Sequence, residues 1–433
     1  MRLKIVPVFI FLLALIGTTA CDKEEVPTLN PNDSYTITIM EDKDIFMQKF
    51  GKIILTKYPN ITLLFASPPA FEAGTDRLQA MTQFLHQMKP DILFLSYKMF
   101  AQLSQAKQLL DLTPFIKADK FDIENFHQAV IELLHGLEPD RLYGLSPTFI
   151  KSGIFYNKEL FDKYNVKYPA NKLTWEDISR ISQQFPLNLN DDRKLVGLYI
   201  DNLYGGDLNL YTDRMLQLAS FEQVPILNTN GTTLLMDDPK WKTIWQFLKS
   251  NFQTGAFVKV EDSNRRDLFL AGEAAMALTP NVYIQLLERN MNGNWGVVTE
   301  PVSKEKPNHS YTVSVREVYS IPITSNSPAI AWEILKFMHS EEVTNMMADS
   351  SSFGHLLFTR ESAPRIRGTI DYSVFYELDR WFEPQRGKTT PSFLETFIRS
   401  TEQELKAVIE EDKPIDQALK DLQENGQNAL KNL

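Results

Sequence analysis

The N-terminal third of the chain alternates between short apolar runs and stretches with helical spacing. Residues 35–40 are rich in β-branched side chains and alternate threonine with apolar residues, residues 61–65 form a second strand-like run, and residues 91–95 are almost wholly apolar. Between these runs, residues 41–57 and 75–88 carry apolar side chains at helical spacing. A strand that is apolar on both faces is typical of a parallel sheet covered by helices. The strand–helix–strand–helix–strand order therefore predicts an α/β unit.

The rest of the chain also mixes strands and helices. Predicted strands lie at residues 148–156, 274–278 and 313–323, and predicted helices at residues 241–252, 266–272, 329–339 and, with a break near Pro414, 393–433. Thr174-Trp-Glu-Asp177 has the spacing of a capping box, which begins a helix. Because strands recur after long helical insertions, we expect two α/β units between which the chain crosses more than once.

The N-terminus has the layout of a secretory signal peptide. Arg2 and Lys4 precede an apolar run at residues 5–16, and small side chains then lead to Cys21, the only cysteine. This run is shorter than the ~20 residues that a membrane-spanning helix needs. We therefore expect residues 1–20 to be a cleaved signal peptide and the protein to be exported.

Residues 17–21 resemble the lipobox of bacterial lipoproteins, in which the cysteine is acylated after cleavage. Thr18 stands where such sequences usually carry leucine, so a plain signal peptide followed by an unmodified cysteine is the alternative. The resemblance implies lipidation of Cys21 and anchoring to the outer face of the cell membrane, because two acyl chains at ~0.8 kcal/mol per buried CH₂ suffice for stable tethering. Residues 21–34 are charged and then rich in turn formers, which predicts a flexible tether.

Length and charge restrict the possible functions. The 433 residues exceed the ~250–300 at which a single core stops growing, so two domains are expected. The formal net charge of −10 becomes −12 once Arg2 and Lys4 are removed, and such a surface repels the phosphate backbone of nucleic acids. Nucleic acid is therefore not an expected partner.

The sequence carries no signature of catalysis. None of its six histidines stands four residues from another, and it has no H-E-x-x-H motif, no G-x-S-x-G motif and no glycine–lysine phosphate loop. We expect no metal, no cofactor and no enzymatic activity. A glycosidase needs only two facing carboxylates ~5–10 Å apart, so a carbohydrate-active enzyme is the enzymatic alternative.

Short motifs follow one another in a fixed order over most of the chain. They are Lys57-Tyr-Pro-Asn-Ile61, Pro90-Asp-Ile-Leu-Phe94, Leu110-Asp-Leu-Thr-Pro114, Leu142-Tyr-Gly-Leu-Ser-Pro147, Ile154-Phe-Tyr-Asn-Lys-Glu-Leu-Phe161, Leu173-Thr-Trp-Glu-Asp-Ile178, Asp267-Leu-Phe-Leu-Ala-Gly-Glu-Ala-Ala-Met-Ala277, Asn294-Trp-Gly-Val-Val-Thr-Glu-Pro301 and Ala329-Ile-Ala-Trp-Glu-Ile-Leu-Lys-Phe-Met338. By their joint occurrence, the chain resembles bacterial extracellular solute-binding proteins of the maltose/multiple-sugar type, the substrate receptors of ABC importers.

The resemblance implies a two-lobed fold of the periplasmic-binding-protein type (class II), each lobe a mostly parallel sheet flanked by helices, which closes over a solute by hinge motion. Lobe 1 is expected to hold residues 35–150 and 281–339, and lobe 2 residues 151–280 and 340–433, with crossings near Lys151, Pro280 and His339. The expected solute is a sugar or oligosaccharide, the expected partners are importer permease subunits, and the chain is expected to be a monomer. A ligand-binding component that serves a signalling partner is the alternative function.

Ligand-binding residues are expected at the carboxyl ends of the parallel strands, where open α/β sheets bind their ligands, and at the crossings. Sugar sites combine aromatic faces with polar groups for the hydroxyls. The candidates are Glu41, Asp42, Phe71, Tyr97, Lys98, Phe149, Lys151, Tyr204, Asn281, Tyr283, Arg316 and Tyr319. Glu41 and Asp42 are equally explained as acids that begin a helix, and the aromatic residues as core side chains.

The charge of the ligand is a separate hypothesis. Maltose-type relatives carry tryptophan and a carboxylate after the third strand, where this chain has Leu95 and Lys98, so their sugar contacts do not transfer residue by residue. The cations Lys98, Lys151 and Arg316 raise the hypothesis of an acidic, uronate-like ligand.

Overall fold

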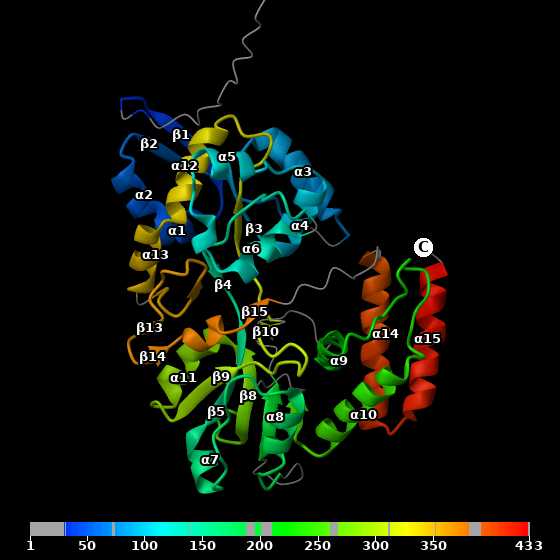
Figure 1. The fold of residues 1–433 in the computed structure, drawn as a ribbon. Helices are drawn as coiled ribbons and strands as arrows, with labels where there is room; N and C mark the ends of the chain where they lie inside the picture. The colour runs from blue at the N-terminus through cyan, green and yellow to red at the C-terminus, as the bar shows by residue number, and fades with distance from the viewer. Residues whose placement is uncertain are drawn as a thin grey trace, which may run out of the picture.

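The computed structural model describes residues 30, 32–71, 74–136, 138–187, 195–200, 210–259, 267–310, 312–350, 352–380 and 391–431. Within these residues, two larger sheets lie in separate halves of the molecule, each with helices around it (Figure 1). None of the helices in the described ranges combines the length and apolar character needed to cross a membrane.

The first half is built on a four-stranded sheet with the order β11–β3–β1–β2. Strands β1 (Tyr35–Met40), β2 (Ile61–Phe65) and β3 (Ile92–Leu95) are parallel, whereas β11 (Val318–Ser320) pairs antiparallel with β3. The three parallel strands predicted from the sequence are therefore confirmed. The helices of this half are α1 (Lys43–Phe46), a π-helical turn (Met47–Gly51), α2 (Lys52–Lys57), α3 (Arg77–Met88), α4 (Tyr97–Gln105), α5 (Thr113–Ala118), α6 (Gln128–His135), α12 (Pro328–Met338) and α13 (Glu341–Ala348).

The second half is built on a five-stranded sheet with the order β7–β6–β8–β5–β9. Its strands are β7 (Phe257–Lys259), β6 (Val196–Ile200), β8 (Ala274–Pro280), β5 (Ser152–Asn157) and β9 (Trp295–Thr299). Only β5 runs against its neighbours, so each sheet is mostly parallel with one reversed strand. The helices are α7 (Lys158–Lys163), α8 (Trp175–Ser182), α9 (Leu210–Phe221), α10 (Pro239–Gln253), α11 (Ile284–Asn290), α14 (Pro391–Glu410) and α15 (Ile415–Lys431).

Apolar side chains cover both faces of the second sheet. Consecutive residues of β8 point to opposite faces, with Ala277 in the core that extends from the first half and Met276 in a second core. The second core lies against α10, α14 and α15, and includes the fully buried Trp241 and Trp245. Two packed faces explain why the predicted strand at residues 274–278 is continuously apolar.

Within the described residues, three segments link the halves, and the first of them pairs with each of the other two; we call residues 148–152, 312–317 and 357–380 the crossing segments. The first contains β4 (Thr148–Phe149) and leads into β5 (Figure 1). Ile150 exchanges two backbone hydrogen bonds with Ser314 of the second, with N···O distances of 2.8 and 3.0 Å. The third pairs with β4 through β12 (Leu357–Phe358), and its β15 (Asp379–Arg380) pairs with β10 (His309–Ser310), which precedes the second.

Strand pairing places two boundaries later than the expected ones near Pro280 and His339. The chain does not return to the first half after β8, because the apolar strand β9 pairs with β5 over five residues. The return therefore lies between β9 and β11. His339 is buried, and the following helix α13 packs into the first core through Val343 and Met347, so the chain leaves the first half only after α13.

Three local expectations have clear outcomes. The capping box of α8 is confirmed: Thr174 Oγ1 accepts from the backbone N of Asp177 at 3.2 Å, and Asp177 Oδ2 accepts from the backbone N of Thr174 at 3.0 Å. The helix expected at residues 266–272 is wrong over residues 267–272, which form a turn where Asp267 Oδ1 accepts two backbone N–H groups. The strand expected at residues 313–323 is only three residues long, because the residues before it form the second crossing segment.

Candidate functional site

The carboxyl edge of the first sheet meets the first crossing segment. Glu41 follows the last residue of β1, and its Oε2 accepts a hydrogen bond from the hydroxyl of Tyr319 in β11 at 3.1 Å. Glu317 immediately precedes β11, and its Oε1 accepts from Thr148 Oγ1 at 3.3 Å. Thr148 belongs to the crossing segment 148–152.

The carboxyl edge of the second sheet reaches the same segment. Asn281 follows the last residue of β8, and its backbone N donates to the carbonyl oxygen of Lys151 at 2.9 Å. Its side-chain Oδ1 accepts from the backbone N of Lys151 at 3.2 Å. Because open α/β sheets bind ligands beyond the carboxyl ends of their strands, the region where both edges meet residues 148–152 is the candidate site.

A buried cluster of charged side chains lies at the first edge; we call Glu41, Lys49, Glu317 and Tyr319 the edge cluster. The ammonium of Lys49 lies 2.5 Å from Glu317 Oε2 and 3.8 Å from Glu41 Oε1. Glu41 is only 4% exposed, and its Oε1 has no hydrogen-bond partner. Burial raises the pKa of Glu41 to about 7, against the opposing effect of the Lys49 ammonium. Two carboxyl groups share one ammonium, so the cluster favours neutral or cationic neighbours over anions.

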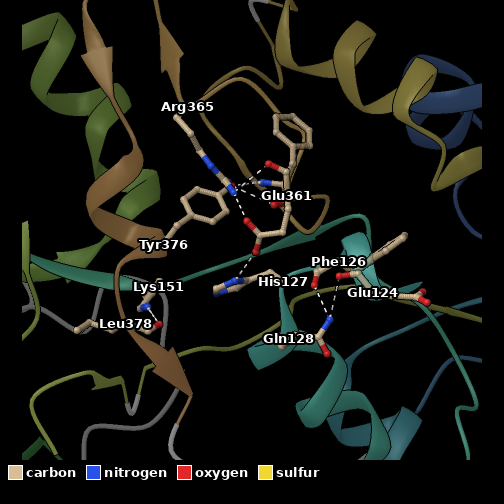
Figure 2. Close-up of polar contacts among 10 residues, drawn as sticks. Glu124, Phe126, His127, Gln128, Lys151, Glu361, Arg365, Tyr376 and Leu378 are labelled. Atoms are coloured by element: carbon tan, nitrogen blue, oxygen red, sulfur yellow. Dashed lines mark hydrogen bonds and ion pairs between the residues drawn. The ribbon is translucent and has the colours of Figure 1, made fainter. Parts of the chain in front are cut away.

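Lys151, predicted as a ligand-binding cation, is directed into the crossing. Its ammonium donates a hydrogen bond to the carbonyl oxygen of Leu378 at 2.6 Å (Figure 2), and the residue is 1% exposed. Burial lowers the pKa of Lys151 to about 8, against the opposing effect of Glu300. In this conformation, the charge of Lys151 is used within the protein.

Three other candidates are also buried around the crossing. Phe149 stacks on His127 with 4.8 Å between ring centroids. Asn281 is held by the two bonds to the backbone of Lys151, and Tyr283 donates its hydroxyl to Asp267 Oδ2 at 2.6 Å. Of these three, only Asn281 bonds to the backbone of the first crossing segment.

Several candidates are exposed or half-buried at the first edge. Asp42 accepts a hydrogen bond from the backbone N of Ile45 at 3.0 Å and so caps α1, as the alternative explanation of this acid predicted. Tyr97 donates its hydroxyl to the carbonyl oxygen of Leu133 at 3.3 Å, and Lys98 beside it is exposed.

The remaining candidates do not join one group. Phe71 is half-buried, with its ring centroid 5.6 Å from the guanidinium carbon of Arg77. Arg316 is exposed on the second crossing segment. Tyr204 and Cys21 lie outside the described residues.

Sequence reasoning missed a polar group that connects α6 with the third crossing segment. His127 Nδ1 lies 2.9 Å from Glu361 Oε1, and Glu361 also binds Arg365, whose guanidinium carbon lies 3.2 Å from the ring centroid of Tyr376 (Figure 2). His127 and Glu361 are 234 residues apart, so no local spacing signals the contact. In the parts of the chain that the structure describes, no three His, Cys, Asp or Glu residues are grouped to hold a metal ion.

Known structures share this architecture over nearly the whole chain. An ABC substrate-binding protein from Listeria monocytogenes, solved in complex with cycloalternan, is 20% identical, with a TM-score of 0.64 over 92% of this chain and 100% of its own. The sugar-binding protein MalE from Xanthomonas citri is 15% identical, with a TM-score of 0.68 over 92% and 98%. A sugar transporter protein from Rhizobium etli, in an open conformation, is 16% identical, with a TM-score of 0.68 over 90% and 99%.

These similarities confirm the expected two-lobed fold of the periplasmic-binding-protein type. The sequence itself gives the family, because residues 49–363 match the model of a family described as bacterial extracellular solute-binding protein. That match begins in the π-helical turn before α2 and ends in the third crossing segment, so it includes the second sheet, strands β2, β3 and β11 of the first sheet, and every residue of the edge cluster except Glu41. The chain therefore belongs to the bacterial extracellular solute-binding protein family.

Proposed function

We propose that this protein captures a sugar or oligosaccharide outside the cytoplasm and delivers it to the permease subunits of an ABC importer. The observation that carries the proposal is the meeting of both carboxyl edges at residues 148–152, through Thr148 on one side and Lys151 on the other. A solute held there contacts both halves, and its binding favours their closure by rotation at the crossing segments. The moving lobes correspond to the two sheets with their helices.

The chemistry of the edge cluster favours a neutral solute. Glu41 and Glu317 share the single ammonium of Lys49, and Lys151 is already bonded to Leu378. One of the similar solved proteins was crystallised with cycloalternan, and another is described as the sugar-binding protein MalE. We therefore propose a neutral sugar for this chain rather than the acidic ligand that its cations suggested.

A panel of sugars tests this function. We expect a neutral oligosaccharide, such as maltotriose or cycloalternan, to raise the melting temperature, because a ligand at 100 times its Kd stabilises the folded state by about 2.7 kcal/mol. The same sugar should lower the radius of gyration in solution scattering, and chromatography should recover it unchanged. Galacturonate oligosaccharides are the matched acidic probe.

Three results would count against the proposal. Binding of the uronates alone would contradict the neutral ligand, and hydrolysis of a bound sugar would contradict a purely binding role. Uptake that stays normal after deletion of the gene, despite tight sugar binding, would favour the sensory alternative. Mass spectrometry of material that copurifies with the protein gives an independent identification of the solute.

We also propose that the protein is a lipoprotein anchored to the outer face of the cell membrane through Cys21. The signal-like residues 1–20 and the small side chains before Cys21 support this anchor. Mass spectrometry of the mature N-terminus is expected to find an acylated cysteine. A free thiol at Cys21, or an intact N-terminal Met1, would exclude the anchor.

A further inference from the structure

The ammonium of Lys151 lies where the three crossing segments meet. Lys151 belongs to the first segment, and its hydrogen bond to the Leu378 carbonyl at 2.6 Å joins the third (Figure 2). Next to it, the backbone N of Ser152 donates to Thr312 Oγ1 of the second segment at 3.0 Å. The Lys151 side chain thus joins the first crossing segment to the third, and the backbone of the next residue joins the first to the second.

A buried acid at the end of β9, before the second crossing segment, interacts with the charge of this ammonium. Glu300 directly follows β9 and is 0% exposed. It accepts a hydrogen bond from the hydroxyl of Ser310, and hydrogen bonding from Thr312 of the second crossing segment also lowers its pKa. Burial raises the pKa of Glu300, and the charge of Lys151 is the largest effect that lowers it. Each of these groups therefore stabilises the charged form of the other.

Two acids of the third crossing segment also stabilise the charged form of Lys151. Glu377 and Asp379 flank Leu378 and also interact with the ammonium of Lys151. Glu300 interacts in addition with Arg214 of α9 in the second half. These charge interactions thus extend from the crossing segments to one helix of the second half, α9.

The arrangement limits how the halves can turn. Rotation of one half against the other changes backbone angles in the crossing segments. A buried ammonium that loses its carbonyl partner is left without a hydrogen bond to compensate for its removal from water, which is unfavourable. Arrangements that keep the hydrogen bond between Lys151 and Leu378 are therefore favoured over others.

We propose that Lys151 is a positioning residue that fastens the first crossing segment to the third, next to the Ser152 link to the second, and so sets how far the two halves stand apart before a solute binds. This inference rests on the proposed function only in treating the segments as a hinge. It requires no contact between Lys151 and the solute.

The test measures the ligand-free full chain. In Lys151→Met, amide hydrogen exchange at residues 148–152, 312–317 and 376–380 is expected to rise about tenfold, while β1 and β6 keep their protection. The radius of gyration in solution scattering should increase. Lys163→Met, which removes an exposed lysine of α7, is the matched control and should change neither quantity.

The double variant Lys151→Met/Glu300→Gln separates positioning from charge neutralisation. It removes both buried charges, so it should fold even where the single variant does not. We expect its melting temperature to recover while exchange at the crossing segments stays fast. If the double variant recovers both the melting temperature and the slow exchange at the crossing segments, the proposal is wrong. It is also wrong if exchange in the single variant rises equally in β1, β6 and the crossing segments. Because no sugar is present, failure here is distinct from failure of the sugar-binding proposal.

Discussion

Replacing Arg360 by methionine will lower the free energy of unfolding by about 3 kcal/mol. Arg360 lies in the third crossing segment and is 6% exposed. Its two terminal nitrogens each lie 2.8 Å from a carboxylate oxygen of Asp122, and its Nε donates to the carbonyl oxygen of His339. The guanidinium carbon also lies 4.8 Å from the ring centroid of Phe126. Methionine fills the volume but leaves the buried His339 carbonyl without this donor.

Urea unfolding followed by circular dichroism measures this loss. Asp122→Asn is the matched variant, because it removes the charge of the partner and keeps one acceptor oxygen. Its cost should be about 1 kcal/mol or less, since the Asp122 side chain is 46% exposed and water replaces part of the interaction. Equal losses in the two variants would show that the ion pair, rather than the buried donor, supplies the stability.

This contact also explains why the boundary near His339 could not be read from the sequence. The peptide of His339 is held by Arg360, and Arg360 binds Asp122 of the first half, 238 residues earlier in the chain. Local patterns end a helix at this point, but they do not reveal which half the next helix joins. The packing of α13 depends on contacts between distant residues.

Elements with local signals were predicted well. The strands at residues 35–40, 61–65 and 91–95 have their own apolar patterns, and Thr174 with Asp177 has a spacing that is typical of a helix start. Partner choice was not predictable in the same way. The sequence of β9 does not by itself indicate that this strand pairs with β5 rather than with a strand of the first sheet.

In the candidate site, too, residues with a local sequence signal were predicted and residues that depend on distant contacts were not. Glu41 was found because it follows a strand, and this position depends only on local sequence. Lys49 and Glu317 were missed because their roles come from contacts across 268 residues. Lys151 was identified as a cation, but its burial and its bond to Leu378 depend on the third crossing segment. The residue type therefore predicts the charge of a side chain, whereas its contacts and burial can be known only from the fold.

Replacing Glu41 by glutamine will stabilise the protein at pH 8 and have little effect near pH 4.5. Burial raises the pKa of Glu41 from 4.5 to about 7 in the folded protein. The folded state therefore binds more protons than the unfolded state between these pH values, and stability falls as pH rises through this window. Glutamine resembles the protonated acid, keeps an acceptor for Tyr319 and does not titrate. The shift corresponds to about 3 kcal/mol at pH 8.

The measurement is the difference in unfolding free energy between the variant and the parent protein at pH 4.5, 6 and 8. Groups that titrate in both proteins cancel in this difference. His339 is one of them, because burial lowers its pKa to about 4 and makes the protein less stable as pH falls from 6.5. Asp42→Asn is the control, since this neighbouring acid is exposed and caps α1. A difference that does not change with pH would contradict a buried, titrating Glu41.

The same variant connects stability with function. A carboxyl group that destabilises the folded protein at neutral pH, and whose Oε1 lacks a hydrogen-bond partner, has no structural advantage over glutamine at this edge. If the carboxylate receives a hydroxyl donor of the sugar when the halves close, Glu41→Gln will be more stable and will bind maltotriose more weakly, by about tenfold for one lost charge-assisted hydrogen bond. Titration calorimetry at pH 8 decides the point. A variant that is more stable and binds with unchanged affinity would assign Glu41 to the packing of the first half rather than to the solute.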